Sequence, residues 1–178
     1  MLRFARMRVQ GAGFVLRPFQ DGDQDAMVRH GDDVAVWRNL TSRFPHPYTR
    51  EAADNWIRIA NANPADACNL AIVVDGEAVG AVGFERGSDL HVRTAEIGYW
   101  LGQRFWGRGL ASAALRLATD IAFTQYDFVR LQAGILDWNA ASCRVAEKAG
   151  YTLEARLRCH VLKDGRICDE LIYVRLRG

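Results

Sequence analysis

Two spacings of apolar residues alternate along the chain, and the change from one to the other separates predicted strands from predicted helices. Apolar runs rich in β-branched and aromatic residues predict strands at 14–19, 70–74, 78–84, 94–101, 129–136, 151–162 and 167–176. The dipeptides Asp75-Gly76 and Asp164-Gly165 each separate two of these runs, and such dipeptides are typical of tight hairpin turns.

Apolar residues three or four positions apart predict the helices. In the longest one, at 109–125, Leu110, Ala114, Leu117 and Ile121 place a single apolar stripe along one side. Shorter helices are predicted toward position 30 after the cap Asp21, at 52–61 after the cap Thr49, and at 140–149 before Gly150. This order of elements indicates an α/β protein with a mixed sheet that carries helices on both faces.

Length and charge limit the kind of protein this is. With 178 residues the chain is long enough for one well-buried core and short for two, so we expect a single domain at 14–176 after an N-terminal extension at 1–13. Lys and Arg number 23 against 21 Asp and Glu, a balance that does not favour binding to nucleic acid or to a membrane surface. The expected partner is a small molecule or a peptide.

The cysteines and the hydropathy pattern predict a cytoplasmic protein without a metal. Cys68, Cys143, Cys159 and Cys168 form no Cys-x-x-Cys pair and have no histidine at the spacing of a zinc site, so we expect reduced thiols. The chain has no apolar run of 18 residues, and the segment 1–13 lacks the continuous apolar stretch of an export signal. We therefore expect neither a membrane span nor export.

The clearest chemical signal lies where an apolar strand meets the longest helix, in the segment Arg104-Phe105-Trp106-Gly107-Arg108-Gly109-Leu110-Ala111. Glycines let backbone N–H groups approach an anion closely, and the N-terminus of a helix favours negative charge. Arg104 and Arg108 add positive charge beside the same loop. The segment therefore predicts a phosphate-binding loop, with an ordinary strand-to-helix turn as the alternative.

Two well-known phosphate motifs fit this loop poorly. A P-loop ends in Gly-Lys followed by Ser or Thr, a tripeptide that the chain lacks, and a dinucleotide fingerprint requires glycine where the chain has Ser112. The spacing Arg104-x-x-Gly107-x-Gly109 instead resembles the pyrophosphate loop of the GCN5-related N-acetyltransferases (GNAT). The strings at 95–102 and 105–109 are similar to the branch of that family that acetylates the N-termini of ribosomal proteins.

The resemblance covers 14–176 and implies the GNAT acyl-CoA N-acyltransferase fold, a mixed, mostly antiparallel sheet with helices on both faces. It also implies that the chain binds acetyl-CoA, releases CoA and uses no metal. In the family, the strand before the loop bulges and offers backbone groups to the pantetheine arm and the thioester. The residues implied to hold acetyl-CoA are Tyr99, Trp100, Leu101, Arg104, Phe105, Trp106, Gly107, Arg108, Gly109, Leu110, Ala111 and Asn139.

The start of the helix at 140–149 carries the implied general acid. Asn139 matches the asparagine of the family that contacts the arm of acetyl-CoA, although an asparagine before a helix is by itself more often a cap. The family often has a tyrosine seven residues later that protonates the departing thiolate, and this chain has Ala146 there. The ribosomal-protein branch resembles this chain at Ser142, whose hydroxyl is the expected catalytic acid; a simple bond to the backbone is the alternative.

Glu96 is the expected general base. Because side chains along a strand alternate between the two faces, Glu96 shares a face with Gly98 and Trp100 and would face the acceptor. An outward-facing glutamate without a role is the alternative, and Asp137 is the reserve candidate. A two-residue turn at Asp164-Gly165 would place His160 opposite Asp169, to bind an amine or to tie the hairpin together. Some of the aromatic residues Trp37, Phe44, Tyr48 and Trp56 are expected to border the acceptor pocket.

These features together predict an N-acetyltransferase that moves an acetyl group from acetyl-CoA to a primary amine by direct attack within a ternary complex. The preferred acceptor is the N-terminal amine of a protein, of the ribosomal-protein type. A small amine or an antibiotic is the alternative acceptor. A non-catalytic acyl-CoA binding module is the alternative from another class, and a nicotinamide or flavin enzyme fits less well. The sequence does not fix the oligomeric state and is compatible with a homodimer.

Overall fold

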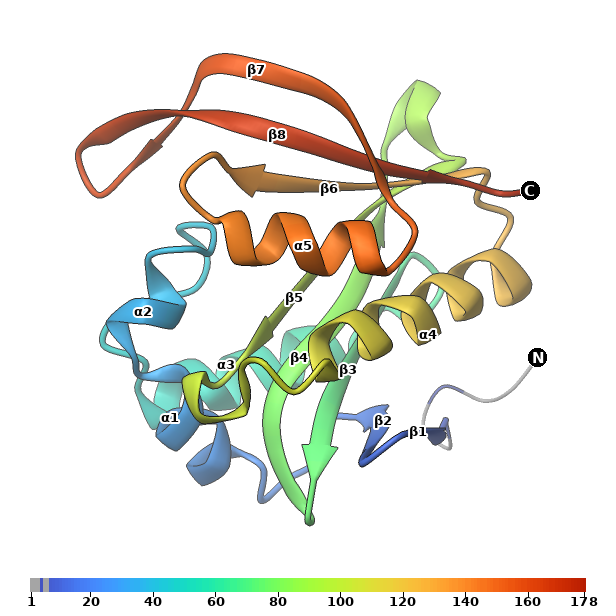
Figure 1. The fold of residues 1–178 in the computed structure, drawn as a ribbon. Coiled ribbons are helices and arrows are strands. Elements are labelled where there is room, and N and C mark those ends of the chain that lie inside the picture. The colour runs from blue at the N-terminus through green and yellow to red at the C-terminus, as the bar shows by residue number, and fades with distance from the viewer. Residues whose placement is uncertain (1–3, 5–6) are drawn as a thin grey trace.

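The computed structural model describes residue 4 and residues 7–178 and contains one eight-stranded sheet (Figure 1). The strand order is β1-β2-β3-β4-β5-β6-β8-β7, and only the pairing of β5 with β6 is parallel in this sheet. The strands are β1 (Val9–Gly11), β2 (Phe14–Pro18), β3 (Ala67–Val74), β4 (Glu77–Arg86), β5 (Thr94–Leu101), β6 (Arg130–Leu136), β7 (Thr152–Lys163) and β8 (Arg166–Leu176). The predicted mixed, mostly antiparallel sheet is confirmed.

Helices cover both faces of the sheet. They are α1 (Gln24–Gly31), α2 (Val34–Trp37), α3 (Arg50–Ala60), α4 (Leu110–Gln125) and α5 (Ala140–Lys148). The apolar stripe of α4 packs with α5 on one face, where Leu115, Ala146 and Ile97 belong to one buried cluster. On the opposite face, α1, α2 and α3 share a second cluster with Trp100 of β5. The sheet therefore separates two apolar layers, and β5 contributes side chains to both.

Sequence analysis missed one strand and one α-helix, both short. Residues 9–11 form β1, which pairs with β2 and lies in the segment expected to precede the domain. Residues 1–3, 5 and 6 of that segment lie outside the described residues. The other element is the single-turn helix α2, whose N-cap Asp33 accepts a hydrogen bond from Ala35 N. Such short elements give too few apolar repeats for a periodicity to stand out.

β5 and β6 pair only at their beginnings. Thr94, Ala95 and Glu96 lie beside Arg130, Leu131 and Gln132, and no pairing follows beyond Glu96. On its other side β5 stays in continuous register with β4 as far as Leu101. One edge of β5 is therefore unpaired from Ile97 onward. No register shift interrupts β5 against β4, so the bulge that the resemblance implied in this strand is absent.

The hairpin of β7 and β8 turns at Asp164-Gly165 as expected, but its register corrects the prediction for His160. The register shifts between Leu157 and Val161 of β7, so three residues lie opposite Asp169 alone. Asp169 accepts a hydrogen bond from Cys159 N (2.9 Å), while His160 Nδ1 lies 2.8 Å from Glu170 Oε2. Cys159 has a φ of 52°, which lets the strand accommodate the extra residues. The predicted His160 and Asp169 pair is therefore wrong, and Glu170 is the partner.

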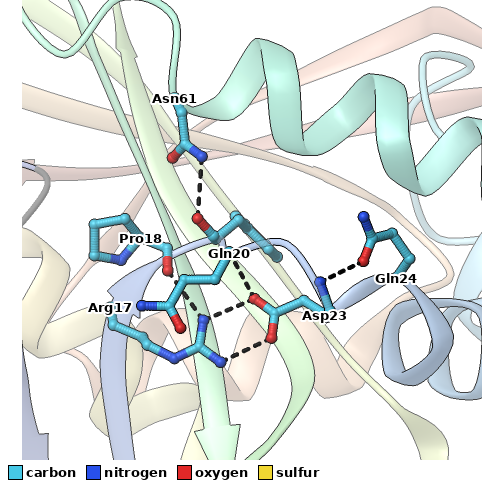
Figure 2. Close-up of polar contacts among 8 residues, drawn as sticks. Arg17, Pro18, Gln20, Asp23, Gln24 and Asn61 are labelled. Carbon is cyan, nitrogen blue, oxygen red and sulfur yellow. Dashed lines mark hydrogen bonds and ion pairs between the residues drawn. The ribbon is translucent and has the colours of Figure 1, made fainter.

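A buried ion pair fixes the start of α1 to β2 (Figure 2). Arg17 donates two hydrogen bonds of 2.7 Å to the two carboxylate oxygens of Asp23, which also accepts from Gln20 N. Both side chains are about nine-tenths buried, with 10% and 8% exposed. Asp23, rather than Asp21, is the residue before the first helical turn, and its side chain makes no cap bond to the helix. The predicted cap at Asp21 is therefore wrong.

Candidate active site

The glycine loop leaves backbone donors free before α4. Gly107 and Gly109 both have a φ of 76°, and a Cβ added to either would have no atom within 4 Å. Gly109 is the residue before the first turn of α4 and offers no side-chain cap. In the described part of the chain, no acceptor bonds the N–H groups from Gly107 to Ala111. Free N–H groups at the start of a sixteen-residue helix form a site suited to a phosphate.

The side chains of the loop either anchor it or add charge to it. Trp106 Nε1 donates a 2.6 Å hydrogen bond to Leu101 O, which ties the loop to the end of β5. The ring of Phe105 contacts the ring of His30 edge-on and also the guanidinium of Arg108, which is 5.2 Å from the Phe105 centroid. Arg104 and Arg108 are exposed and have no ion pair with a described residue. Both cations are therefore available to an anion at the loop.

The unpaired edge of β5 presents the backbone of two of the predicted residues. Just past the strand, Gly102 N donates to Val79 O (2.8 Å), so the even-numbered positions of β5 bond to β4. Tyr99 and Leu101 are odd-numbered, and their backbone groups therefore face the open edge. The backbone groups of Trp100 face β4 instead, and its side chain is buried under the helices of the opposite layer. The expected backbone role thus fits Tyr99 and Leu101 and not Trp100.

Asn139 and Ser142 meet at the start of α5. Asn139 Oδ1 accepts a 3.1 Å hydrogen bond from Ser142 N, so Asn139 caps the helix as the plain alternative stated. The hydroxyl of Tyr99 lies 2.7 Å from Ser142 Oγ and 3.1 Å from Ser142 O, and either hydroxyl can be the donor in the shorter contact. Ala146, one turn further, is fully buried. The hydroxyl pair of Tyr99 and Ser142 was not predicted, because no sequence spacing links positions on β5 and α5.

Glu96 lies on the other face of the sheet, in a cavity of about 750 Å³. The cavity lies over the paired beginnings of β5 and β6, and Gln132 and Arg130 of β6 line it beside Glu96. Arg43, from the loop before α3, also lines the cavity. Gly98, two residues along the same face, leaves open space because a Cβ there would have no atom within 4 Å. Glu96 therefore borders a cavity on the strand face that alternation assigns to it.

The other predicted residues of the acceptor side lie elsewhere. Asp137 Oδ2 lies 3.4 Å from Arg156 Nη2, in the ion-pair cluster that holds the bulge of β7. None of the four predicted aromatic residues lines the cavity at Glu96. Phe44 and Tyr48 are stacked and Phe44 packs on Trp100, while Trp37 lies under Lys163 and Trp56 packs against Phe19. Sequence analysis also missed Arg43, which precedes Phe44 in a loop without a regular pattern.

Burial perturbs the tyrosine on β5. The pKa of Tyr99 is raised to about 12, because burial disfavours the charged phenolate more than the bond to Ser142 favours it. Tyr99 is therefore a neutral hydroxyl, able to donate a hydrogen bond, over the whole physiological pH range. Among the described residues, no group of His, Cys, Asp or Glu side chains is arranged to hold a metal ion. All four cysteines are free thiols in the structure.

Comparisons with known proteins agree with this geometry. The family described as "Acetyltransferase (GNAT) domain" matches residues 14–152. The uncharacterized N-acetyltransferase p20 of Bacillus licheniformis is 26% identical over 164 residues, which is 91% of this chain and 92% of p20. The L-amino acid N-acetyltransferase AaaT of Escherichia coli (strain K12) is 24% identical over 166 residues, which is 92% of this chain and 98% of AaaT.

Solved structures share the fold over nearly the full length. RimL, a ribosomal L7/L12 alpha-N-protein acetyltransferase in complex with coenzyme A, has a TM-score of 0.82 at 20% identity, covering 96% of this chain and 98% of RimL. At that identity the likeness establishes the fold.

None of the described helices is long and apolar enough to cross a bilayer.

Proposed function

Because the chain belongs to the acetyltransferase (GNAT) family, we propose that it transfers the acetyl group of acetyl-CoA to the N-terminal amine of a protein, of the ribosomal-protein type. One observation carries the proposal. The free N–H groups before α4 lie at one end of β5, and the Glu96 cavity lies at the other end on the opposite sheet face. Between them runs the unpaired edge of β5.

This arrangement separates the two substrates. The glycine loop, with Arg104 and Arg108, would hold the pyrophosphate of acetyl-CoA, and the Tyr99 and Leu101 backbone would hold its pantetheine arm and thioester. The acceptor amine would enter from the Glu96 cavity and meet the thioester at the opening between β5 and β6. Asn139 Oδ1 caps the helix turn that carries Ser142, and its amide nitrogen, which has no hydrogen-bond partner among the described residues, would contact the arm of acetyl-CoA.

Each step of the transfer then has a candidate group. Glu96 takes a proton from the ammonium group, directly or through water, and the freed nitrogen attacks the thioester carbon. A new C–N bond forms as the C–S bond breaks, and the electron pair of that bond leaves on sulfur. Ser142 gives the sulfur a proton, and the nitrogen loses its second proton to solvent. A positioned general base contributes about 10²- to 10⁴-fold to such a rate.

Arg43 favours a second acceptor class. Its guanidinium lines the same cavity as Glu96 and makes a single contact of 3.4 Å with Glu85, both side chains being mostly exposed. An α-amino acid carries an ammonium and a carboxylate close together, so it could pair with Glu96 and Arg43 at once. The relative AaaT is named as an L-amino acid N-acetyltransferase. A free amino acid is therefore the alternative acceptor.

The test is a thiol-release assay with acetyl-CoA and a panel of acceptors. The panel contains peptides with free N-termini, the same peptides with blocked N-termini and one internal lysine, free amino acids and small diamines. Release of CoA with the free N-termini alone, with the added acetyl group located by mass spectrometry, supports the proposal. Turnover of amino acids in preference to peptides would select the alternative, and release without any amine would contradict both.

A further inference from the structure

α5 has an alanine, Ala146, at the place where the resembling family often has its tyrosine acid. Ala146 is fully buried against the α4 layer, so a phenol there would have no room. The only hydroxyl on α5 is Ser142, in the first turn. A serine hydroxyl has a single proton and rotates freely about its C–O bond. It donates toward a chosen atom only if a neighbour fixes that rotation.

Tyr99, which lies on β5 and not on α5, is that neighbour. Its side chain leaves β5 on the same face as α5, and its hydroxyl lies 2.7 Å from Ser142 Oγ and 3.1 Å from Ser142 O. The phenol has one proton, which it gives to one of these two oxygens at a time, and the shorter contact is to Oγ. When the phenol proton lies on Oγ, the proton of the serine has to point elsewhere. The backbone of Tyr99 meanwhile faces the unpaired edge of β5, and its hydroxyl reaches the first turn of α5, the helix that follows β6.

We propose that Tyr99 is the positioning residue of the acid step: its hydroxyl donates to Ser142 Oγ and thereby directs the serine proton to the departing sulfur of CoA. This inference rests on the proposed function. The tyrosine reaches the site from strand β5 instead of from helix α5, which accounts for the alanine at 146.

The proton balance of this step is simple. The C–S bond breaks and its electron pair stays on sulfur, which takes the Ser142 proton and becomes the CoA thiol. Ser142 recovers a proton from Tyr99 or from water, and Tyr99 recovers its own from water. The nitrogen of the new amide has released one proton to solvent, so the number of protons is unchanged. Nothing is oxidised or reduced.

Burial keeps the Tyr99 hydroxyl able to donate. The raised pKa of Tyr99 means that the phenol stays protonated, and so retains the proton that the proposed bond requires, throughout the working range of the enzyme. The other titratable groups here are Cys143 and Glu147 on α5, Tyr151, and Tyr173 on β8, whose hydroxyl donates to Glu147 Oε1 (3.0 Å). None of them has a hydrogen bond to Ser142 Oγ.

The first test is kinetic. Tyr99→Phe removes one oxygen, and we expect kcat to fall about tenfold while the KM for acetyl-CoA changes less than about twofold, because the bond acts as charge builds on sulfur. Ser142→Ala should lose at least as much. The double variant should be no slower than Ser142→Ala alone, because Tyr99 acts only through Ser142. Additive losses in the double variant would overturn the proposal.

The second test needs no turnover. The affinities of CoA and of desulfo-CoA are measured by calorimetry at pH 7 and at pH 9.5, on either side of an ordinary thiol pKa of about 8.5. A donor at the sulfur favours the thiolate, so the preference of the wild type for CoA should grow about tenfold with pH. Groups of the protein that titrate affect both ligands alike. The growth should disappear in Tyr99→Phe, and its persistence there would overturn the proposal.

Tyr151→Phe is the matched control. The hydroxyl of Tyr151 also lies 2.7 Å from another hydroxyl, that of Thr119, and is buried in the same layer. This variant should lose stability like Tyr99→Phe but keep its kcat and its preference for CoA at high pH. Equal kinetic losses in both variants would make Tyr99 a structural residue. A wild type that releases CoA with no acceptor at all would instead refute the proposed function, and with it this step.

Discussion

Glu96 of β5 lies directly opposite Glu85 of β4, so two carboxylates line the same cavity side by side. Like charges in this position destabilise a pair of strands. Arg43 offsets the charge of Glu85 at 3.4 Å, whereas Glu96 has no hydrogen bond or ion pair with any described residue. Arg86 and Arg130 also line the cavity, but they are paired with Asp127 and Glu154. Glu96 is therefore the carboxylate of the lining that has no partner among the described residues, and it favours a cation beside it. The ammonium group of an acceptor is such a cation.

The first prediction follows for Glu96→Gln. The amide keeps the size of the side chain but accepts no proton, so kcat at neutral pH should fall by about 10²- to 10⁴-fold while CoA still binds. The loss should shrink at high pH, where more of the amine is already deprotonated. Steady-state rates between about pH 7 and about pH 10 measure both effects.

Glu85→Gln is the control for charge alone. It removes one of the two negative charges from the same cavity, so it should raise the KM for the amine and leave kcat within about threefold. If Glu85→Gln and Glu96→Gln lower kcat equally, the two carboxylates act only through the electrostatic potential of the cavity, and neither is a general base. An unchanged rate in Glu96→Gln would exclude Glu96 as the base and direct attention to Asp137 or to His160 with its partner Glu170.

The second prediction tests the glycine loop. Gly107→Asp places a carboxylate beside N–H groups that have no other acceptor, and like-charge repulsion from the pyrophosphate should abolish measurable CoA binding. Gly165→Asp is the matched control, because Gly165 also has a positive φ, of 70°, and open space for a Cβ, in the distant turn of β7 and β8. It carries the same backbone strain and should bind CoA normally. Calorimetry on both folded variants makes the comparison.

How much the sequence can predict is clear from this loop and from β5. The loop could be predicted because its function is carried by consecutive residues: Gly107 and Gly109 supply the φ of 76°, and the helix after them supplies free N–H groups. Glu96 could be assigned a face because strand side chains alternate. The backbone roles were only partly predictable, because the even positions of β5 bond to β4 and this removes Trp100.

The parts that could not be predicted depend on contacts between distant elements. Ser142 and Tyr99 are 43 residues apart in sequence and meet only because α5 packs over the face of β5 from which Tyr99 projects. The predicted partner of His160 was wrong for a different reason. A register shift in β7 moves it from Asp169 to Glu170, and no turn signal marks that shift. Local patterns do not encode where two strands slip against each other.

The third prediction concerns ligand binding as such. A ligand that binds only the folded state, at a hundredfold excess over its Kd, stabilises that state by about 2.7 kcal/mol. For a chain of this size we expect CoA to raise the Tm by roughly 5–10 °C. NADH should have no effect, because the loop lacks the third glycine of a dinucleotide site. An equal rise with NADH in the thermal scan would refute a site selective for CoA.

The fourth prediction is a pH dependence at the bulge of β7. The pKa of Asp169 is lowered from its ordinary value of 3.8, first by the hydrogen bond from Cys159 N and then by that from Arg156. The folded state therefore binds fewer protons than the unfolded one, and the contribution of Asp169 to stability is complete above pH 3.8 and is lost below it. Asp169→Asn should lower the urea midpoint at pH 6 and make it less dependent on pH below about 4. Asp21→Asn, an exposed carboxylate without a hydrogen bond to a described residue, should change neither; a steeper acid dependence in Asp169→Asn would contradict the assignment.

The last prediction concerns the anchor of α1. Asp23→Ala leaves Arg17 without its carboxylate in a site that is about nine-tenths buried, and an uncompensated buried charge costs about 3–5 kcal/mol of the free energy of unfolding. The loss should be smaller in the double variant Arg17→Met/Asp23→Ala, because removing both charges leaves no unpaired ion. Asp21→Ala, two residues away and exposed, should stay within about 0.5 kcal/mol of the wild type. Urea unfolding measures the free energy of unfolding of the three variants and of the wild type. If the double variant is less stable than Asp23→Ala, then Arg17 stabilises the fold mainly through its bond to Pro18 O and its packing rather than through the ion pair.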